Sequence, residues 1–389
     1  MKWDEYLSQR LEHWQLQGLG RKLKTIQAPG IHHSQSKHIL SFASNDYLSL
    51  ATHPKVCAAA KSAIDQLGTG SGSSPLVCGH TLRHDELERD LANFKQSESA
   101  LVFSSGYQSA LAVLVALAGT QETIILDRLA HASLLDGAHL SGARVRIFKH
   151  NNLTDLSRLL EREKSRRCIV VVESLYSMDG DLAPLQEIMS LVETAGALLL
   201  VDEAHATGVL GISGRGALES PTMRHGSLPG AVIAMGTLSK ALGSQGGFIC
   251  ASKMITDTIV HAGRAYLFST ALAPACAAAA REALKLIDSE PERRRHLMAL
   301  SQKLRQDLKM LHLEIPDSIG PIIPVIVGNE ALATRWSDEL LKMQIYVPAI
   351  RYPTVRKGSA RLRISLNAGH TEDNCQTLLN GLQSVSACP

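Results

Sequence analysis

A single lysine, Lys240, stands in a segment otherwise made of glycine, serine, threonine and small apolar residues, 231–249. An apolar run precedes it, and Thr237 and Ser239 place hydroxyl groups beside it. The segment has no carboxylate to pair with the amine, and its glycines allow close backbone approach. Such an amine can form a Schiff base with the aldehyde of pyridoxal phosphate. The same pattern is also typical of a solvated loop lysine after a buried strand.

A carboxylate and an imidazole follow another apolar run. Asp202 comes directly after Ala197–Val201, and His205 is three residues further on. A carboxylate at the end of a buried strand is costly unless it pairs with a cation, and a protonated pyridine nitrogen is such a cation. The pairing would shift a pKa by about 1–3 units and keep the ring positive. We expect His205 to bond a ring hydroxyl.

Of two alternative interpretations of these residues, the sequence excludes an RNA helicase and disfavours a serine hydrolase. The letters Asp-Glu-Ala-His at 202–205 also occur in one class of RNA helicases, which require a GxxxxGK[ST] phosphate loop. The chain contains no Gly-Lys dipeptide. A serine hydrolase of the nucleophile-elbow type requires G-x-S-x-G, and this pattern is absent as well.

Further polar residues follow other apolar runs. A turn that contains Gly106 and Tyr107 opens a helix and suits a phosphate, because a helix N-terminus presents free N–H groups. His131 follows residues 122–126 and could stack on a planar ring, and Ser177 follows residues 168–172. Taken singly, the turn at Gly106 is more typical of an ordinary helix cap, His131 is more typical of a helix start, and Ser177 also fits a simple turn. Ligands of parallel sheets bind beyond the carboxyl ends of strands, so we expect these residues to share one cleft.

The elements that must position these residues alternate between strand and helix. Seven strands are expected at 100–103, 122–126, 144–148, 168–173, 197–201, 231–235 and 247–251. The alternation predicts an α/β fold with a mostly parallel seven-stranded sheet that helices cover on both faces. A smaller α+β unit follows. We expect an N-terminal helix and strand segment at 1–45, a large domain at 46–288 and a small domain at 289–389.

Composition narrows the class of protein. The chain has 389 residues, 45% of them hydrophobic, and a net charge of +3, which is too small to favour nucleic acid. Seven cysteines without a CxxC pair predict neither a disulfide framework nor a metal site. The polar N-terminus and the lack of a long apolar run predict a cytoplasmic protein without a membrane partner.

Several motifs together resemble the α-oxoamine synthases, pyridoxal-phosphate enzymes of the aspartate-aminotransferase fold (fold type I). The matching segments span most of the chain: Ser44–Leu48, Gly68–Gly72, Asp127–Ser133, Ser177–Gly180, Val201–His205, Gly236–Lys240 and Ala360–Arg363. Within the family, Leu76–His84, Arg21 and Pro353–Thr354 are most similar to the branch that serves biotin biosynthesis.

The resemblance implies roles for individual residues. The catalytic residues would be Lys240, which binds the cofactor and removes the substrate's Cα proton, Asp202 on the pyridinium nitrogen, and His131 stacked on the ring. The residues that bind the cofactor would be Gly106, Tyr107, His131, Ser177, Asp202, His205, Thr237 and Lys240. Those that bind substrate would be Arg21, His131, Thr354 and Arg363, with Arg363 on the amino-acid carboxylate and Arg21 and Thr354 on the acyl group.

The resemblance also implies a reaction and an assembly. We expect decarboxylative condensation of L-alanine with a pimeloyl thioester, carried by coenzyme A or by acyl carrier protein. Glycine C-acetyltransferase and the other α-oxoamine synthase activities remain alternatives. The family is dimeric with sites at the subunit interface, so we expect a homodimer in which Ser269 and Thr270 serve the partner's phosphate site.

Overall fold

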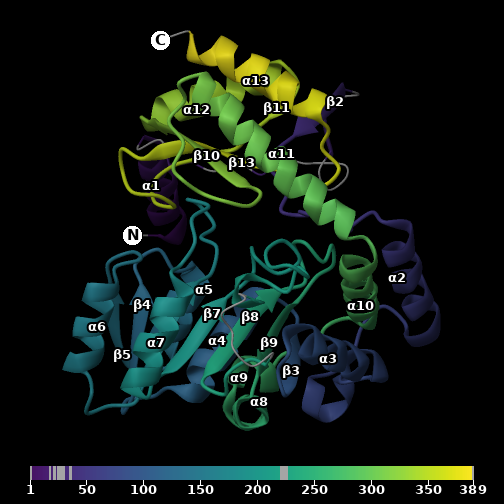
Figure 1. The fold of residues 1–389 in the computed structure, drawn as a ribbon, viewed down its shortest axis with the longest axis vertical. Coiled ribbons are helices and arrows are strands. Elements are labelled where there is room, and N and C mark those ends of the chain that lie inside the picture. The colour runs from purple at the N-terminus through teal and green to yellow at the C-terminus, as the bar shows by residue number, and fades with distance from the viewer. Residues whose placement is uncertain are drawn as a thin grey trace.

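The computed structural model describes residues 2–16, 19–20, 23, 31–34, 37–219 and 227–387. Its chain forms a larger lobe around an open sheet and a smaller lobe above it (Figure 1). The sheet of the larger lobe has the strand order β3-β9-β8-β7-β6-β4-β5. Its strands are β3 Ser99–Phe103, β4 Thr123–Asp127, β5 Arg144–Phe148, β6 Cys168–Glu173, β7 Leu198–Asp202, β8 Val232–Thr237 and β9 Gly247–Ala251.

The seven strands lie within two residues of their predicted positions. Strand β9 is antiparallel to both of its neighbours, and the pairs among β8, β7, β6, β4 and β5 are parallel. The mostly parallel sheet predicted from the sequence is therefore confirmed. Two predicted strand-end residues, Asp202 and Thr237, are the last residues of β7 and β8.

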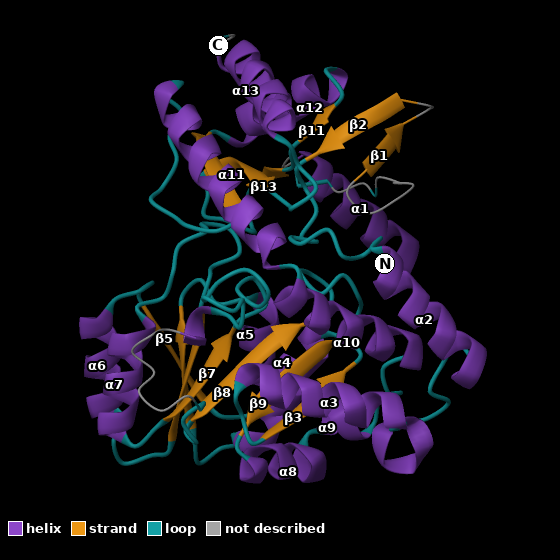
Figure 2. Ribbon diagram, turned by 45° about the vertical axis from the view of Figure 1, so that its right-hand side comes forward, coloured by secondary structure: helices purple, strands orange, loops and turns teal. Residues whose placement is uncertain are grey.

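Helices cover both faces of this sheet (Figure 2). Alternate strand residues face opposite cores: Val170 and Val172 of β6 belong to one buried cluster, and Ile169 and Val171 to the other. Such continuous apolar strands are typical of parallel sheets buried on both sides. The helices that contribute to the first core include α3 Leu82–Lys95, α6 Leu153–Arg162, α7 Leu185–Ala195 and α10 Pro274–Ser289. Those of the second are α4 Gly106–Leu117, α5 Ala132–Leu140, α8 Lys253–Ala262 and α9 Arg264–Leu267.

The smaller lobe combines segments from both ends of the described chain. Its sheets have the orders β10-β13-β12 and β1-β2-β11, and β2 runs parallel to β11. Its later elements are α11 Pro291–Met310, β10 Ile322–Gly328, α12 Glu330–Lys342, β11 Ile345–Tyr346, β12 Ala349–Ile350, β13 Ala360–Ser365 and α13 Glu372–Ser386. The earlier strands are β1 Ile31–Ser34 and β2 Lys37–Ser41. The predicted division at residues 45 and 288 stays a prediction.

The remaining elements are two α-helices and two short helical turns. They are α1 Trp3–Leu16, α2 Pro54–Leu67, the π-helical turn η1 Pro75–Gly79 and the 3₁₀ turn η2 Ala217–Glu219. The predicted N-terminal helix is present as α1, but it has no buried residue, and Trp3 and Leu16 are among its exposed apolar side chains. None of the described helices pairs sufficient length with sufficient hydrophobicity for bilayer spanning.

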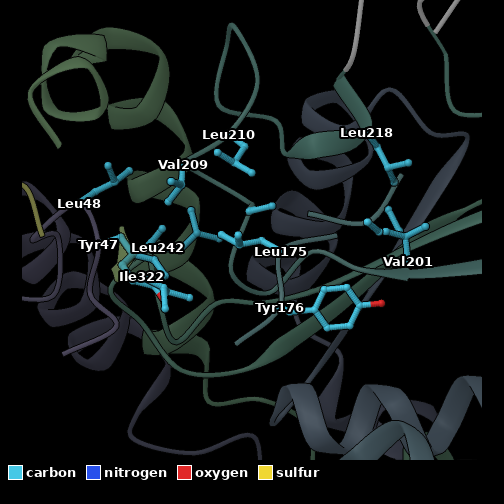
Figure 3. Close-up of a cluster of buried hydrophobic side chains, with 14 of the residues drawn as sticks. Tyr47, Leu48, Leu175, Tyr176, Val201, Val209, Leu210, Leu218, Leu242 and Ile322 are labelled. Atoms are coloured by element: carbon cyan, nitrogen blue, oxygen red, sulfur yellow. The ribbon is translucent and has the colours of Figure 1, made fainter. Parts of the chain in front are cut away.

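A buried apolar cluster supports the loops at the carboxyl end of the sheet (Figure 3). Tyr47, Leu175, Val201 and Leu242 come from four different segments of the chain and are at most 1% exposed. Ile322 of β10 joins the same cluster from the smaller lobe. Three of the four stand one or two residues from Asp202, Lys240 or Ser177. The packing of these apolar side chains therefore fixes the segments that carry Asp202, Lys240 and Ser177.

A buried ion pair holds the segment that follows β7. Lys95 Nζ lies 2.7 Å from Glu203 Oε2 and donates to Thr207 Oγ1 at 2.9 Å and to the carbonyl of Arg215. Glu203 Oε1 accepts the N–H of Leu218 at 3.0 Å. Both charged side chains are at most 3% exposed. Removal of one partner would leave the other charge buried and unpaired.

We therefore expect Lys95→Met to lower the free energy of unfolding by about 3–5 kcal/mol. Urea denaturation of the cofactor-free protein, followed by far-ultraviolet circular dichroism, measures this loss. The matched control is Lys253→Met, which breaks an exposed pair with Asp257 on α8 and should cost at most about 1 kcal/mol. Equal midpoints for the two variants would contradict the role assigned to the buried pair.

Candidate active site

Lys240 lies in the tight loop between β8 and β9. Its Nζ is 2.7 Å from His205 Nε2, and His205 Nδ1 is 2.6 Å from the hydroxyl oxygen of Tyr47. The loop requires glycine at position 243, where φ is +56° and a Cβ would lie 2.3 Å from the backbone nitrogen of Ala51. The structure thus brings the predicted lysine and the predicted histidine into direct contact.

Burial changes the charge state of this pair. It lowers the pKa of Lys240 to about 8, with a further lowering from Arg363 that Asp202 and Glu173 oppose. Burial also lowers the pKa of His205, and Lys240 adds to the effect. A neutral amine is the nucleophilic and basic form of lysine, and desolvation is a known way to obtain it near neutral pH.

Asp202 ends β7 and is 6% exposed. Its Oδ1 accepts the N–H of Ala204 at 2.8 Å. Among the described residues the carboxylate has no ion pair within 4 Å. Burial raises the pKa of Asp202, while Lys240 and the Ala204 N–H oppose this rise. A buried anion without an ion-pair partner fits a ligand that supplies a cation, as a pyridinium nitrogen does.

His131 caps helix α5 and lies near both groups. Its Nδ1 is 2.8 Å from Ser133 Oγ and accepts the N–H of Ser133 at 3.3 Å. Burial lowers its pKa, Asp202 opposes this effect, and Lys240 adds to it. Its hydrogen bonds to Ser133 hold the ring, and the effects of Asp202 and Lys240 on its pKa show that both groups are near it.

The predicted phosphate-binding residues come together at the start of α4. Gly106 is the first residue of this helix, and a Cβ there would lie 3.4 Å from Thr237 Cβ. Thr237 Oγ1 lies 2.7 Å from Ser239 Oγ and donates to the Gly246 carbonyl at 2.8 Å. Tyr107 is 45% exposed, and its hydroxyl donates to Asp136. A helix N-terminus flanked by hydroxyl groups suits a phosphate dianion.

Arg363 belongs to the smaller lobe, and its side chain contacts residues of the same site. It lies on β13, donates from Nε to the carbonyl of Ser177 at 2.6 Å, and donates from Nη1 to Asn45 Oδ1 at 3.2 Å. Nearby, Arg361 donates to Asp179 Oδ1 at 2.6 Å. Two arginines of one strand thus hold the turn that carries Ser177. Arg363 is only 5% exposed, and its hydrogen bonds fix the orientation of the guanidinium.

The polar groups of this site are those that pyridoxal phosphate requires. Lys240 offers an amine for the aldehyde, and Asp202 offers a carboxylate for the ring nitrogen. The N-terminus of α4 offers N–H groups for the phosphate. The aldehyde, the ring nitrogen and the phosphate of one small molecule thus each find a matching group: in the loop after β8, at the end of β7 and at the start of α4.

Comparison with known proteins agrees with this geometry. Residues 37–382 match the family model described as aminotransferase class I and II. A protein of Cellvibrio japonicus named 8-amino-7-oxononanoate synthase is 42% identical over 384 residues, which are 98% of this chain and 96% of that protein. This chain belongs to the 8-amino-7-oxononanoate synthase family.

Solved structures show the same fold. A serine palmitoyltransferase from S. paucimobilis with bound PLP-myriocin has a TM-score of 0.90 at 30% identity, covering 98% of this chain and 96% of that one. An 8-amino-7-oxononanoate synthase from Francisella tularensis has a TM-score of 0.77 at 30% identity, covering 90% and 98%. The predicted fold-type-I architecture and its cofactor class, pyridoxal phosphate, are thereby confirmed.

Some residues predicted to belong to the site lie away from this cluster. Arg21 lies outside the described residues. Thr354 is exposed in the loop between β12 and β13, and its N–H donates to the carbonyl of Arg351 at 3.0 Å. Thr270 accepts a hydrogen bond at its carbonyl from Ser104 Oγ at 2.8 Å, so it lies next to the turn before Gly106, and Ser269 is its chain neighbour.

Sequence reasoning assigned no role to three residues that contact the site. Asn45 and Tyr47 were noticed only as letters of a family motif. Glu173 ends β6 opposite Asp202, its Oε2 accepts the N–H of Ser177 at 3.2 Å, and burial together with Asp202 raises its pKa well above the usual value. Glu173, like Asp202, is a carboxylate at the end of an apolar strand, so the same signal in the sequence marks both residues.

The lowered pKa of Lys240 predicts a pH profile for covalent attachment of pyridoxal phosphate to the cofactor-free protein. Only the neutral amine attacks an aldehyde. The attachment rate should therefore rise about tenfold per pH unit below the pKa and level off above about 8. Stopped-flow absorbance of the attached cofactor measures the profile.

Two variants check the origin of this profile. Lys240→Ala should show no attachment at any pH. Asp202→Asn removes an anion that opposes the lowering, so its midpoint should fall below 8. A rate that climbs steadily toward the pKa of an ordinary lysine, about 10.4, would contradict the burial argument.

Proposed function

We propose that this chain condenses L-alanine with a pimeloyl thioester, releasing carbon dioxide and the free thiol carrier and forming 8-amino-7-oxononanoate for biotin biosynthesis. The observation that carries this proposal is the 42% identity to the Cellvibrio japonicus enzyme of that name along nearly the whole of both chains. The Lys240, Asp202, His205 and His131 constellation supports it. Such an enzyme is an acyltransferase.

In this proposal the cofactor supplies the reactive groups, and the protein binds the cofactor and sets the protonation state of its ring. Bound pyridoxal phosphate supplies an aldehyde for amino groups and a ring that accepts the electron pair of a developing carbanion. Asp202 would keep the ring nitrogen protonated, because a nearby anion favours the charged form. His131, His205 and Ser177 would hold the ring and its hydroxyl group. Gly106, Tyr107 and Thr237 would hold the phosphate and its surroundings.

Lys240 acts as the base of the reaction. Its Nζ receives the proton from the Cα of alanine, and burial makes its neutral form available near pH 8. His205, 2.7 Å from Nζ, fixes the position of the amine. Burial raises the pKa of Tyr47, so its hydroxyl stays protonated and can donate to His205 Nδ1.

Arg363 binds the carboxylate of alanine in this proposal. A planar guanidinium matches a carboxylate in geometry and charge. Its position beside Lys240 and His205 is supported by the effect that it has on the pKa of each. Arg21 and Thr354 are proposed to contact the acyl substrate, where the distal carboxylate of a pimeloyl group would give Arg21 an ionic partner.

We also propose that the working form is a homodimer. The turn η1 exposes Leu76 and Val77 at 58% and 75%, and Phe268 at the end of α9 is 73% exposed. The two segments adjoin, since Ala271 N–H donates to the carbonyl of Ser73 at 3.0 Å. A contiguous exposed apolar surface is typical of a protein interface. It lies beside Thr270 and supports the assignment of Ser269 and Thr270 to the partner's phosphate site.

The substrate assignment is tested by comparing thioester and amino-acid pairs. Alanine with pimeloyl thioester, on coenzyme A and on acyl carrier protein, is compared with glycine plus acetyl thioester and serine plus palmitoyl thioester. We expect kcat/KM for the first pair to exceed the others by at least about 100-fold, since acyl length and the methyl group both discriminate. Product mass spectrometry and thiol release measure it. A higher value for glycine with acetyl thioester would replace this proposal by an acetyltransferase.

The role of Asp202 is tested by Asp202→Asn, which keeps the shape and removes the charge. The cofactor should still attach and absorb in the visible range, while kcat falls by about 10²–10³-fold because carbanion stabilisation is lost. The control is Asp257→Asn on the exposed face of α8, which should leave kcat unchanged. A kcat within threefold of the parent enzyme would exclude the proposed role of Asp202.

A further inference from the structure

His150 lies between two carboxylates at the same edge of the sheet as the cleft. It follows β5, its Nδ1 is 2.9 Å from Asp127 Oδ1, and its Nε2 is 2.7 Å from Asp181 Oδ2. A neutral imidazole has one N–H, so only the imidazolium donates to both carboxylates. Burial lowers the pKa of His150, but its bonds to the two carboxylates outweigh this effect and raise it to about 10.

The imidazolium joins three neighbouring strands. Asp127 ends β4, Asp181 stands in the loop after β6, and β4 lies between β5 and β6 in the sheet. His150 therefore reaches from the edge strand across the end of β4 to the loop of β6. Its own side chain is 26% exposed, whereas that of Asp127 is fully buried.

Asp127 fixes the start of the loop that ends at His131. Its Oδ1 also accepts the N–H of Leu129 at 2.8 Å, and its carbonyl accepts the N–H of Ala130 at 3.1 Å. Only three residues separate Asp127 from His131, so a shift of the Asp127 carboxylate would also displace the imidazole of His131.

Asp181 closes the turn that carries Ser177. Its carbonyl accepts the N–H of Tyr176 at 3.0 Å, and its Oδ2 also accepts a hydrogen bond from Asn151 Nδ2 at 2.9 Å. The ring of Tyr176, labelled in Figure 3, meets the ring of His150 edge-on with centroids 4.4 Å apart. The turn is thus held by His150 on one side and by the arginines of β13 on the other.

We propose that His150 is a positioning residue that binds Asp127 and Asp181 at once and so sets the separation between His131 and Ser177 that the cofactor requires. The inference rests on the proposed roles of His131 and Ser177 in the pyridoxal-phosphate site and is independent of which substrates are used. Residues that contact a ligand must be held within about 0.5 Å, which their supporting contacts achieve.

The test measures cofactor binding without substrate. His150→Leu keeps the approximate size of the ring and removes both donors. At a temperature where thermal scans show the variant fully folded, we expect its Kd for pyridoxal phosphate to rise about 10–100-fold, as for other supporting residues. The visible circular dichroism of the bound cofactor should also weaken. The control, Arg158→Leu, removes an exposed ion pair with Asp155 on α6 and should change neither signal.

Two further variants show whether His150 acts through Asp181. His150→Gln can donate to one carboxylate at a time and should give an intermediate Kd. Asp181→Asn alone should weaken binding, and in the His150→Leu background it should weaken it no further, because the link is already broken.

Several outcomes would overturn the proposal. One is a folded His150→Leu protein with a lower melting temperature but an unchanged Kd and circular dichroism, which would leave His150 a structural role alone. If His150→Leu does not fold, an unchanged Kd in both His150→Gln and Asp181→Asn overturns it equally. A parent protein that binds no pyridoxal phosphate would overturn this inference and the proposed function together, whereas a different preferred substrate would overturn only the latter.

Discussion

A carboxylate buried at the end of a central strand is the main constraint on this molecule. Asp202 ends β7, Glu173 ends the neighbouring β6, and Lys240 follows β8 on the other side. Two acids and one amine thus share a poorly solvated space, where an unpaired charge is costly. Burial disfavours the charged form of each group, and it therefore raises the pKa of both acids and lowers the pKa of the amine. A positively charged group beside Asp202, as proposed for the ring nitrogen of the cofactor, would relieve this cost.

The elements most predictable from sequence were those with a local signal. Apolar runs separated by helical segments located the seven strands, positions directly after strands singled out Asp202, His131 and Ser177, and the lack of other charged residues around it singled out Lys240. The antiparallel direction of β9 was not predicted, because side-chain alternation does not encode strand direction. Pairing of β2 with β11 was missed for a related reason: it joins residues far apart in the chain, and nothing local marks it. Asn45 and Tyr47 precede α2 in an irregular segment, where periodicity provides no guide.

The two solved structures differ in their fold similarity to this chain but not in their sequence identity to it. The serine palmitoyltransferase structure has the higher TM-score, 0.90, although it and the Francisella synthase are each 30% identical to this chain. The same architecture thus occurs in proteins that are named for different reactions, a serine palmitoyltransferase and an 8-amino-7-oxononanoate synthase. Choice among substrates must therefore reside in side chains around the cleft. Arg363, which β13 of the smaller lobe carries into contact with Asn45 and Ser177, does not discriminate among amino-acid donors, because the carboxylate that it is proposed to bind is common to all of them.

The parallel pairing of β2 with β11 also bears on how the protein is made. Every strand of the large sheet has been synthesised once residue 251 leaves the ribosome, and its central strands can then associate. Strand β2, by contrast, must wait about 300 residues for its partner at Ile345–Tyr346. Contacts between such distant segments form slowly and leave strand edges exposed in the meantime. The nascent chain therefore carries an unpaired edge of β2 through most of translation, and Arg363 is synthesised shortly after the strand that covers this edge.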